Sequence, residues 1–410
     1  MKQYSTSQLC RPSRFLRTLR LLIALLLSSS AIFAESRARF GDAIQVRGDL
    51  NNSRLRFERD KIGSVAFLGG SITEMQGYRP LVYEILKKRF PNTAFTFTNA
   101  GIGSTCSNTG AFRLNRDVLQ HGPVDLLFVE FAVNDDQDGH FNREECIRGM
   151  EGIVRRARLQ NPNVDIVMTF FVNERMIKSL RRGEQPVSIA AHEAVAAHYQ
   201  IPTVNVAREL TDEITAGTMT YERYGGVHPG PVGQTLCARM ISELLGHFWS
   251  APLPVSAHVS AQVLPTKPLD PLSYFSGRFL DVRQANVLSG WTIETPDWES
   301  LPGRKAPRLV KIPMLCATKL GAELTVDFEG TSIGAFIVSG PDAGIVEVSV
   351  DGEQVRSCNL FTGYSGGLHY PWTVMLGNNL KPGKHRMNLR MSEKTTKTGH
   401  AMRIMEFCAN

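Results

Sequence analysis

The chain has 410 residues, of which 42% are hydrophobic, so it is too long for one ordinary core and apolar enough for two packed domains. Its formal charge of +7 comes mostly from the N-terminus: residues 1–34 hold five basic side chains and no acidic one, and the remainder has 41 basic against 39 acidic residues. A charge this balanced excludes the electrostatic footprint of a nucleic-acid-binding protein.

Residues 1–34 have the pattern of a secretory signal peptide. Basic residues spread over positions 11–20 precede a short apolar run at 21–27, and small residues follow up to Ala34, where we expect cleavage. The apolar run is too short to span a membrane comfortably, although an uncleaved anchor is the alternative. We therefore expect an exported protein, periplasmic or secreted, with no stable membrane span in its mature form.

Apolar strand patterns alternate with helical patterns between residues 35 and 250. Strands separated by helices predict a parallel sheet that helices cover on both faces. The expected strands are residues 65–68, 94–98, 125–133, 164–172 and 203–206, and the expected helices are residues 79–90, 143–160, 188–199 and 232–248.

The pattern changes near residue 250. Residues 251–271 contain five prolines and have no periodicity, which predicts a linker or a strap across the surface. Short strand patterns separated by glycine turns follow, among them the Asp351-Gly352 hairpin signal after an apolar run. We interpret residues 272–410 as a β-sandwich.

Four short motifs carry polar side chains at the ends of the predicted strands or just before the last helix. They are Gly69-Gly70-Ser71-Ile72-Thr73, Asn99-Ala100-Gly101-Ile102-Gly103-Ser104, Ala132-Val133-Asn134-Asp135 and Gly225-Gly226-Val227-His228-Pro229. Ligands bind at the carboxyl ends of the strands of an open α/β sheet. Ser71 could therefore act as a nucleophile and His228 as its general base, while flexible backbone and an Asn amide could stabilise an oxyanion. Taken singly, each motif is also an ordinary turn or cap.

In this order the motifs resemble the four sequence blocks of the SGNH/GDSL hydrolase family, over roughly residues 60–250. The resemblance implies a flavodoxin-like three-layer α/β/α fold and esterase chemistry through an acyl-enzyme. It makes Ser71 the nucleophile and His228 the base. Asn134, with the backbone N–H groups of Ser71 and of the second block, would form the oxyanion hole.

Three of the blocks depart from the family pattern without removing a reacting group. Gly70 stands where the family usually has Asp, and Ala132 stands where it usually has Gly. The oxyanion glycine of the second block aligns with Ser104, and the neighbouring Gly103 could take its place. A backbone donor tolerates this change if the loop keeps its conformation.

The last block lacks the acid that orients the histidine, because Gly225 occupies its Asp position. Some family members work with a Ser–His dyad in which a backbone carbonyl replaces the acid. Otherwise the candidates are Glu222, which is near in sequence, and Glu130, which interrupts an apolar strand and could equally be a structural, hydrogen-bonded acid. Losing the acid without replacement costs about 10⁴ in rate.

No cofactor or metal site is predicted. His192 and His198 are six residues apart, which places them on different faces of a helix. The six cysteines that follow the signal show no C-x-x-C spacing, and no phosphate-binding or dinucleotide-binding fingerprint is present.

The C-terminal region resembles the β-sandwich modules attached to many carbohydrate esterases. Its aromatic side chains could stack on sugar rings, or they could belong to the core. The residues concerned are Trp291, Trp298, Tyr364, Tyr370 and Trp372.

We therefore expect an exported esterase that hydrolyses ester groups, most simply O-acetyl groups, on a carbohydrate. A lipase, lysophospholipase or thioesterase of the same family is one alternative. A non-catalytic glycan-binding protein with a decayed hydrolase site, suggested by Gly225, is the other.

Overall fold

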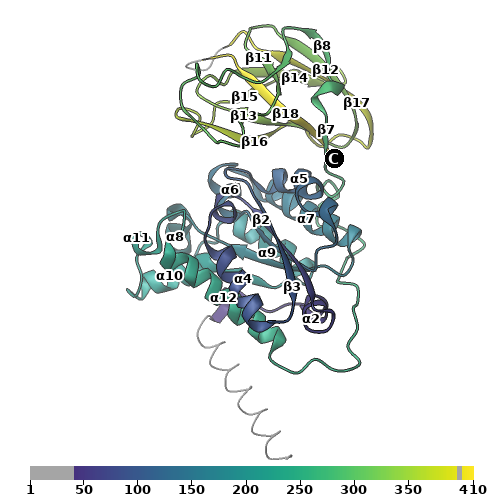
Figure 1. The fold of residues 1–410 in the computed structure, drawn as a ribbon. Coiled ribbons are helices and arrows are strands. Elements are labelled where there is room, and N and C mark those ends of the chain that lie inside the picture. Colours follow the sequence, from purple (N-terminus) through teal and green to yellow (C-terminus); the bar gives the residue numbers. More distant parts are fainter. Residues whose placement is uncertain (1–40, 395–398) are drawn as a thin grey trace, which may run out of the picture.

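The computed structural model describes residues 41–394 and 399–410, which form an α/β domain and a β-sandwich domain (Figure 1). The predicted signal peptide, residues 1–34, lies outside the described residues. Within the described part of the chain, no helix has the length and apolar character needed to cross a membrane.

The α/β domain is built on a six-stranded sheet in the order β1-β6-β5-β4-β2-β3. Only β1 is antiparallel to its neighbour; the other five strands pair in parallel. Without β1, the strand order is that of the flavodoxin-like fold. The strands are β1 (Ile44–Gln45), β2 (Ile62–Gly69), β3 (Ala94–Gly101), β4 (Leu126–Glu130), β5 (Asp165–Phe170) and β6 (Thr203–Asn205).

Helices cover both faces of this sheet. The chain moves one way along the sheet from β2 to β3 and the other way from β3 through β4 and β5 to β6. Right-handed crossovers therefore place α4 (Tyr78–Arg89) on one face and α5 (Ser107–Asp117), α7 (Arg143–Gln160) and α9 (Val187–His198) on the other. The last helix, α12 (Pro231–Trp249), packs against α4. The predicted three-layer α/β/α fold is confirmed.

Several predicted helices have nearly the predicted bounds because their ends are marked in the sequence. Helix α7 begins with a capping box in which Asn142 Oδ1 accepts from Glu145 N and Glu145 Oε2 accepts from Asn142 N, both at 3.0 Å. The remaining helical segments are η1 (Gly41–Ala43), α2 (Asn51–Leu55), η2 (Arg56–Asp60), α3 (Ser71–Glu74), η3 (Leu119–His121), α6 (Ala132–Gln137), α8 (Glu174–Arg181), α10 (Val206–Thr215), α11 (Tyr221–Tyr224) and η4 (Val282–Gln284).

One predicted strand is too long. The apolar run at residues 125–133 forms β4 only as far as Glu130, and the chain enters the short helix α6 at Ala132. Both elements are buried, and an apolar run does not by itself distinguish a buried strand from a buried helix. Asn134 therefore lies in a helix that begins just beyond the carboxyl end of the central strand.

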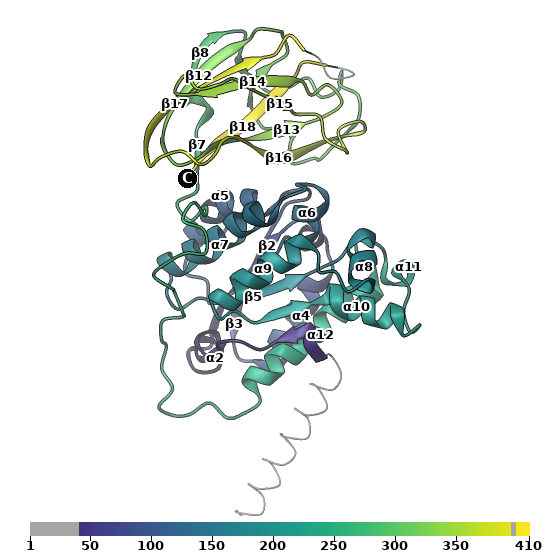
Figure 2. The same ribbon diagram turned by 180° about the vertical axis from the view of Figure 1, so that it is seen from behind.

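Residues 251–271 contain no helix or strand and run along the surface of the α/β domain (Figures 1 and 2). Backbone N–H groups of Leu269 and Asp270 donate to the buried carboxylate of Glu151, at 2.6 and 2.9 Å. Arg148 forms an ion pair with Asp270 at 2.8 Å. This segment is therefore attached to the domain as a strap.

The second domain consists of two facing sheets with their own apolar core. One sheet has β7 (Arg278–Leu280), β9 (Thr292–Glu294), β10 (Arg304–Lys305), β11 (Met314–Ala317), β13 (Ile333–Ser339), β16 (Leu368–Gly377) and β18 (Met402–Ala409). The other has β8 (Asn286–Ser289), β12 (Glu323–Gly330), β14 (Ile345–Val350), β15 (Arg356–Asn359) and β17 (Gly383–Met391). All pairs are antiparallel except β10 with β16, which confirms the predicted sandwich.

The sandwich is stacked on the end of the α/β domain where α5 and α6 lie (Figures 1 and 2). Thr109 of α5 donates to Thr373 of β16 at 2.9 Å. Arg116 of α5 lies 4.6 Å from the ring centre of Phe279 in β7. Because α6 follows the carboxyl end of β4, the sandwich stands over the edge of the sheet where the polar motifs were predicted to meet.

Candidate active site

Ser71 and His228 are in direct contact. Ser71 is the first residue of α3, immediately beyond β2, and His228 lies in the loop between α11 and α12. The Oγ atom of Ser71 is 2.8 Å from Nε2 of His228, although the two residues are 157 positions apart. With the ring proton on Nδ1, Nε2 can accept the serine proton, which is the arrangement of a nucleophile and its general base.

The turn that carries Ser71 rests on the buried carboxylate of Glu130. Oε1 of Glu130 accepts hydrogen bonds from Gly70 N at 2.9 Å, Thr73 N at 3.2 Å and Thr73 Oγ1 at 2.6 Å. Burial raises the pKa of Glu130 to about 7, and the hydrogen bonds from Thr73 and Gly70 limit the rise. Glu130 is therefore a support for the nucleophile turn.

Steric crowding explains why position 70 has glycine where the family usually has Asp. A Cβ atom at position 70 would lie 2.1 Å from Oδ1 of Asn134. The glycine thus lets the Asn134 amide approach the nucleophile turn. Asn134 is buried, and its Nδ2 donates to Oδ2 of Asp138 at 2.6 Å, so its second amide hydrogen is available for another acceptor.

The second block supplies a backbone donor at Ser104. Ser104 has φ of 62°, the left-handed conformation that glycine adopts most easily, which fits its alignment with the family's glycine. In the described part of the chain, the N–H groups of Ser71 and Ser104 have no hydrogen-bond acceptor, whereas Gly103 N donates to Oε2 of Glu74 at 2.8 Å. Of the two predicted donors, Ser104 is the one whose N–H is free for an oxyanion.

Neither candidate acid hydrogen bonds to His228. Glu130 uses Oε1 beneath the nucleophile turn, and Glu222 is exposed on α11. No residue that the structure describes accepts a hydrogen bond from Nδ1 of His228, and the imidazole is exposed. The arrangement is that of a Ser–His dyad open to solvent.

The missing acid follows from the shape of the loop. Gly225 has φ of 110°, and a Cβ atom there would lie 2.0 Å from the backbone nitrogen of Gly230. No side chain fits that space without moving the loop, so the family's Asp cannot occupy this position here.

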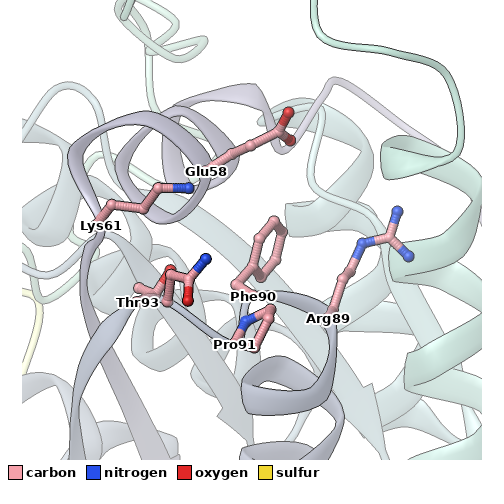
Figure 3. Close-up of a pocket in the computed structure, with 7 residues that line it drawn as sticks. Glu58, Lys61, Arg89, Phe90, Pro91 and Thr93 are labelled. Atoms are coloured by element: carbon pink, nitrogen blue, oxygen red, sulfur yellow. The ribbon is translucent and has the colours of Figure 1, made fainter.

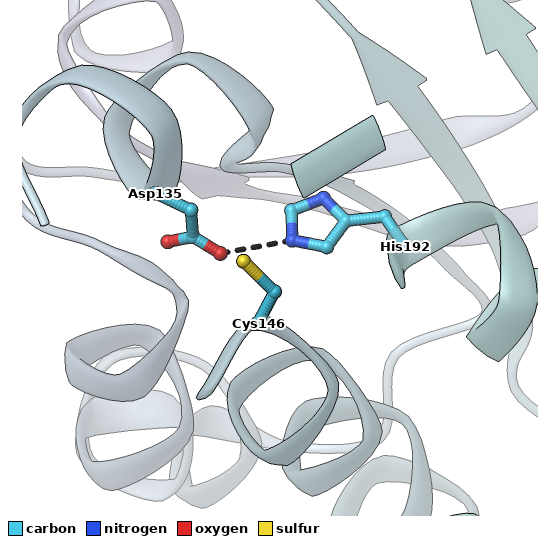
Figure 4. Close-up of side chains that lie close together, drawn as sticks. All are labelled: Asp135, Cys146 and His192. Carbon is cyan, nitrogen blue, oxygen red and sulfur yellow. Dashed lines mark hydrogen bonds and ion pairs between the residues drawn. The ribbon is translucent and has the colours of Figure 1, made fainter. Parts of the chain in front are cut away.

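Asp135, next to Asn134, joins three helices behind the site (Figure 4). Its carboxylate accepts from Ser107 N at 2.8 Å, Ser107 Oγ at 2.7 Å and lies 2.9 Å from Nε2 of His192. Potential ligand atoms of Asp135, Cys146 and His192 lie within 4.8 Å of one another, all buried. Burial, together with the charge of Asp135, raises the pKa of the Cys146 thiol. We interpret the cluster as a hydrogen-bonded support for α5, α6 and α9. In the sequence, the only indication of this cluster is that Asp135 follows Asn134 in the third motif.

Two pockets lie at opposite ends of the sheet. A 260 Å³ pocket next to Lys61 and Thr93 borders the amino ends of β2 and β3 (Figure 3). Ser71 follows the opposite, carboxyl end of β2. A 540 Å³ pocket lies between the two domains, with residues 137–140 on one side and residues 359–364 and Trp372 on the other. Its lining includes Asp138, the acceptor of the Asn134 amide, so the pocket lies next to Asn134.

The predicted aromatic residues of the sandwich divide into two groups. Trp291, Trp298 and Tyr370 are buried in the domain. Tyr364 and Trp372 line the pocket between the domains, together with Phe361, which sequence reasoning did not single out.

Comparisons with known proteins found matches to the α/β domain and to the two-domain fold. Residues 67–236 match the model of the GDSL-like Lipase/Acylhydrolase family. A search of curated protein sequences found no match. Two crystal structures of a two-domain esterase active on acetylated mannans, one with mannopentaose, are similar over 89% of this chain and 96% of theirs, at 23% identity and TM-scores of 0.72 and 0.70. An acetyl xylan esterase from Geobacillus stearothermophilus covers 45% of this chain and 97% of its own, at 20% identity and a TM-score of 0.37. The two-domain likeness shows that both domains share a known fold.

Replacing Glu130 by Gln should change how stability depends on pH. Because the pKa of Glu130 is raised to about 7, the folded protein holds this proton more tightly than the unfolded chain does. The stabilisation is complete below the ordinary carboxyl pKa and is lost as the pH rises through 7. Glu130→Gln mimics the protonated form, so its melting temperature relative to wild type should increase between pH 5 and pH 8. Asp165, with a pKa also raised to about 7, contributes equally to both proteins. A difference that stays constant with pH would contradict this assignment.

Introducing the family acid at position 225 should damage the site instead of completing it. Gly225→Asp forces a side chain into the backbone of Gly230, so the loop that carries His228 must move away from Ser71. We expect slower labelling of Ser71 by a fluorophosphonate probe and a lower melting temperature. Gly226→Asn is the control, because that position has a φ of 80° that Asn tolerates and open space around it. Faster labelling of Gly225→Asp than of wild type would refute the steric argument.

Proposed function

We propose that this protein is an exported esterase that removes O-acetyl groups from a carbohydrate through an acyl-enzyme. The match of residues 67–236 to the GDSL-like lipase/acylhydrolase family supports the esterase chemistry. The observation that carries the proposal is the 2.8 Å contact between Ser71 Oγ and His228 Nε2 at the carboxyl edge of the sheet. The family match supports a carboxylic-ester hydrolase. The choice of carbohydrate ester and the export of the protein are the parts that need testing.

In the first half of the proposed reaction, Ser71 Oγ attacks the ester carbonyl while its proton passes to Nε2 of His228. The oxyanion that forms accepts hydrogen bonds from the N–H groups of Ser71 and Ser104 and from the Asn134 amide. As the bond between the carbonyl carbon and the sugar oxygen breaks, the imidazolium protonates that oxygen, so the sugar leaves with a free hydroxyl and the acyl group stays on Ser71.

In the second half, a water molecule attacks the acyl carbon and gives a proton to His228. The imidazolium returns this proton to Ser71 Oγ as the bond between Ser71 Oγ and the acyl carbon breaks, which releases the acid and restores the serine. The catalytic acid of the family mainly fixes the histidine tautomer and stabilises the imidazolium. Since His228 is exposed, solvent can hydrogen bond to Nδ1 and perform part of that work. This argues for a functional dyad and against a decayed site.

The pocket between the domains supports a carbohydrate substrate. Its aromatic side chains, Phe361, Tyr364 and Trp372, come from the sandwich, and polar groups of Asp138 and Asn359 lie among them. Sugars offer apolar ring faces together with hydroxyl groups, so this mixed lining suits them better than it suits a long acyl chain. The similar two-domain esterase acts on acetylated mannans.

Hydrolysis of p-nitrophenyl acetate tests the enzyme and its dyad. Ser71→Ala and His228→Ala should each lower kcat by at least about 10³, since either change removes the nucleophile and base as a unit. Ser256→Ala and His258→Ala, on the exposed part of the strap, should match wild type. Wild-type turnover no faster than that of Ser71→Ala would show that the protein is not a serine esterase.

The substrate class is tested by comparing kcat/KM across ester types. We expect an acetylated mannooligosaccharide to be a better substrate than p-nitrophenyl octanoate, a lysophospholipid or an acyl thioester, because the pocket lining is mixed and not a continuous apolar groove. Trp372→Ala should raise KM for the oligosaccharide and leave that for p-nitrophenyl acetate unchanged. A preference for the octanoate would instead assign the protein to the lipases.

A further inference from the structure

Two hydrogen-bond donors beside the nucleophile are each bonded to a carboxylate of the α/β domain. Gly103 N donates to Oε2 of Glu74 at 2.8 Å, and Asn134 Nδ2 donates to Oδ2 of Asp138 at 2.6 Å. Gly103 immediately precedes the Ser104 donor. The two carboxylates therefore determine where both walls of the oxyanion hole lie.

The first carboxylate is held by the sandwich. Nη1 of Arg308 forms an ion pair with Oε1 of Glu74, and Oε2 of Glu74 is the acceptor of Gly103 N. A Cβ atom placed on Gly103 would lie 3.5 Å from Cβ of Ser71 and 3.9 Å from Nη2 of Arg308, which puts the guanidinium beside the nucleophile. Leu309, the next residue, is buried in an apolar cluster with Trp298, and this anchors the loop that carries Arg308.

The second carboxylate also faces the sandwich. Tyr364 and Asp138 line the same pocket between the domains, and the Tyr364 side chain is one of the groups that lower the pKa of Asp138. The loop of Tyr364 is fixed by Ser365, whose Oγ accepts from Thr362 N at 2.9 Å and lies 2.7 Å from Oγ of Ser339 in β13. Tyr364 is thus presented to Asp138 from a defined position on the sandwich.

We propose that the β-sandwich is a positioning part of the catalytic centre, acting through Arg308–Glu74–Gly103 and Tyr364–Asp138–Asn134 to hold the oxyanion donors in place. This rests on the proposed esterase function and deepens it. Arg308 and Tyr364 are positioning residues: they act on the donors through the carboxylates.

Arg308 should also affect the transition state through its positive charge. Glu74 lies one backbone N–H away from the Ser104 donor, so its charge opposes the negative charge that develops on the substrate oxygen. The adjacent guanidinium compensates that charge. Losing Arg308 should therefore both free the loop of Gly103 and leave a carboxylate that disfavours the transition state.

The test uses the full chain and p-nitrophenyl acetate, a substrate too small to require the glycan pocket. Loss of one oxyanion donor costs about 10²–10³ in kcat, so misplacing one should cost roughly tenfold. We expect Arg308→Ala to lower kcat about tenfold with little change in KM, and added guanidinium to restore part of it. The kcat of Arg308→Lys should lie between those of wild type and Arg308→Ala. Tyr364→Phe should lose less kcat than Arg308→Ala does. Glu74→Gln combined with Arg308→Ala should recover activity relative to Arg308→Ala alone.

The control is Arg116→Ala, which removes another contact between the domains, the pair with Glu406 at 3.7 Å and the stacking on Phe279. It should keep wild-type kcat per folded molecule even if the melting temperature falls. The proposal is overturned if Arg308→Ala keeps wild-type kcat, or if Arg116→Ala loses as much. It is also overturned if only KM for an acetylated oligosaccharide rises, which would make Arg308 a substrate contact. A wild-type protein with no esterase activity would instead refute the proposed function.

Discussion

The buried carboxylate of Glu130 is the contact on which the geometry of the site depends. One oxygen of this residue receives both backbone N–H groups of the Gly70–Thr73 turn and the Thr73 hydroxyl. Glu130 ends β4, and the turn follows β2, so the contact joins two adjacent strands at their carboxyl ends. Ser71 stands on that turn, and its hydroxyl is presented to His228 only while the turn keeps this shape.

A second buried polar side chain, Arg113, stabilises the same carboxyl edge of the sheet. The guanidinium of Arg113 in α5 is fully buried and donates to the carbonyl of Gly69 at 2.9 Å and that of Ala100 at 2.6 Å. These carbonyls end β2 and β3, the strands that lead to the nucleophile turn and to the second block. Glu130 and Arg113 together leave little freedom for the backbone that carries Ser71 and the oxyanion donors, which is the pre-organisation that electrostatic catalysis requires.

Much of the fold could be predicted because its signals are local. The bounds of α7 follow from Asn142 and Glu145 at its start and from Asn161-Pro162 at its end. The parallel sheet follows from apolar runs separated by helices. The end of β4 could not be predicted, since the apolar run continues into α6 without a change of composition.

Only those site residues that stand in the sequence motifs could be predicted. Ser71, Asn134 and His228 stand in ordered motifs, and the flavodoxin-like topology brings the ends of those strands together. The roles of Glu74 and Asp138 depend on partners more than 200 residues away in sequence, Arg308 and Tyr364. Neither lies in a motif, and nothing in a local pattern links an arginine in a sandwich loop to a glutamate after the nucleophile. Gly225 looked like a defect in sequence, whereas the structure gives it a steric reason, the close approach of Gly230.

The charged side chains around the proposed oxyanion hole explain why catalysis should depend on both domains. Three carboxylates, Glu74, Glu130 and Asp138, surround a place where the reaction creates negative charge, and none of them contacts His228. An oxyanion hole tolerates such neighbours only if each is neutralised or turned away. Burial lets Glu130 keep a proton up to about pH 7. Asp138 is half-buried, desolvation raises its pKa, and its carboxylate accepts from the side-chain amides of Asn134 and Gln137. Glu74 is partly exposed; within its own domain its Oε2 accepts from Gly103 N, and its counter-ion is Arg308 of the sandwich. In the α/β domain alone, Glu74 would keep the hydrogen bond from Gly103 and lose this counter-ion, so we infer that the sandwich supplies the cation that balances its charge.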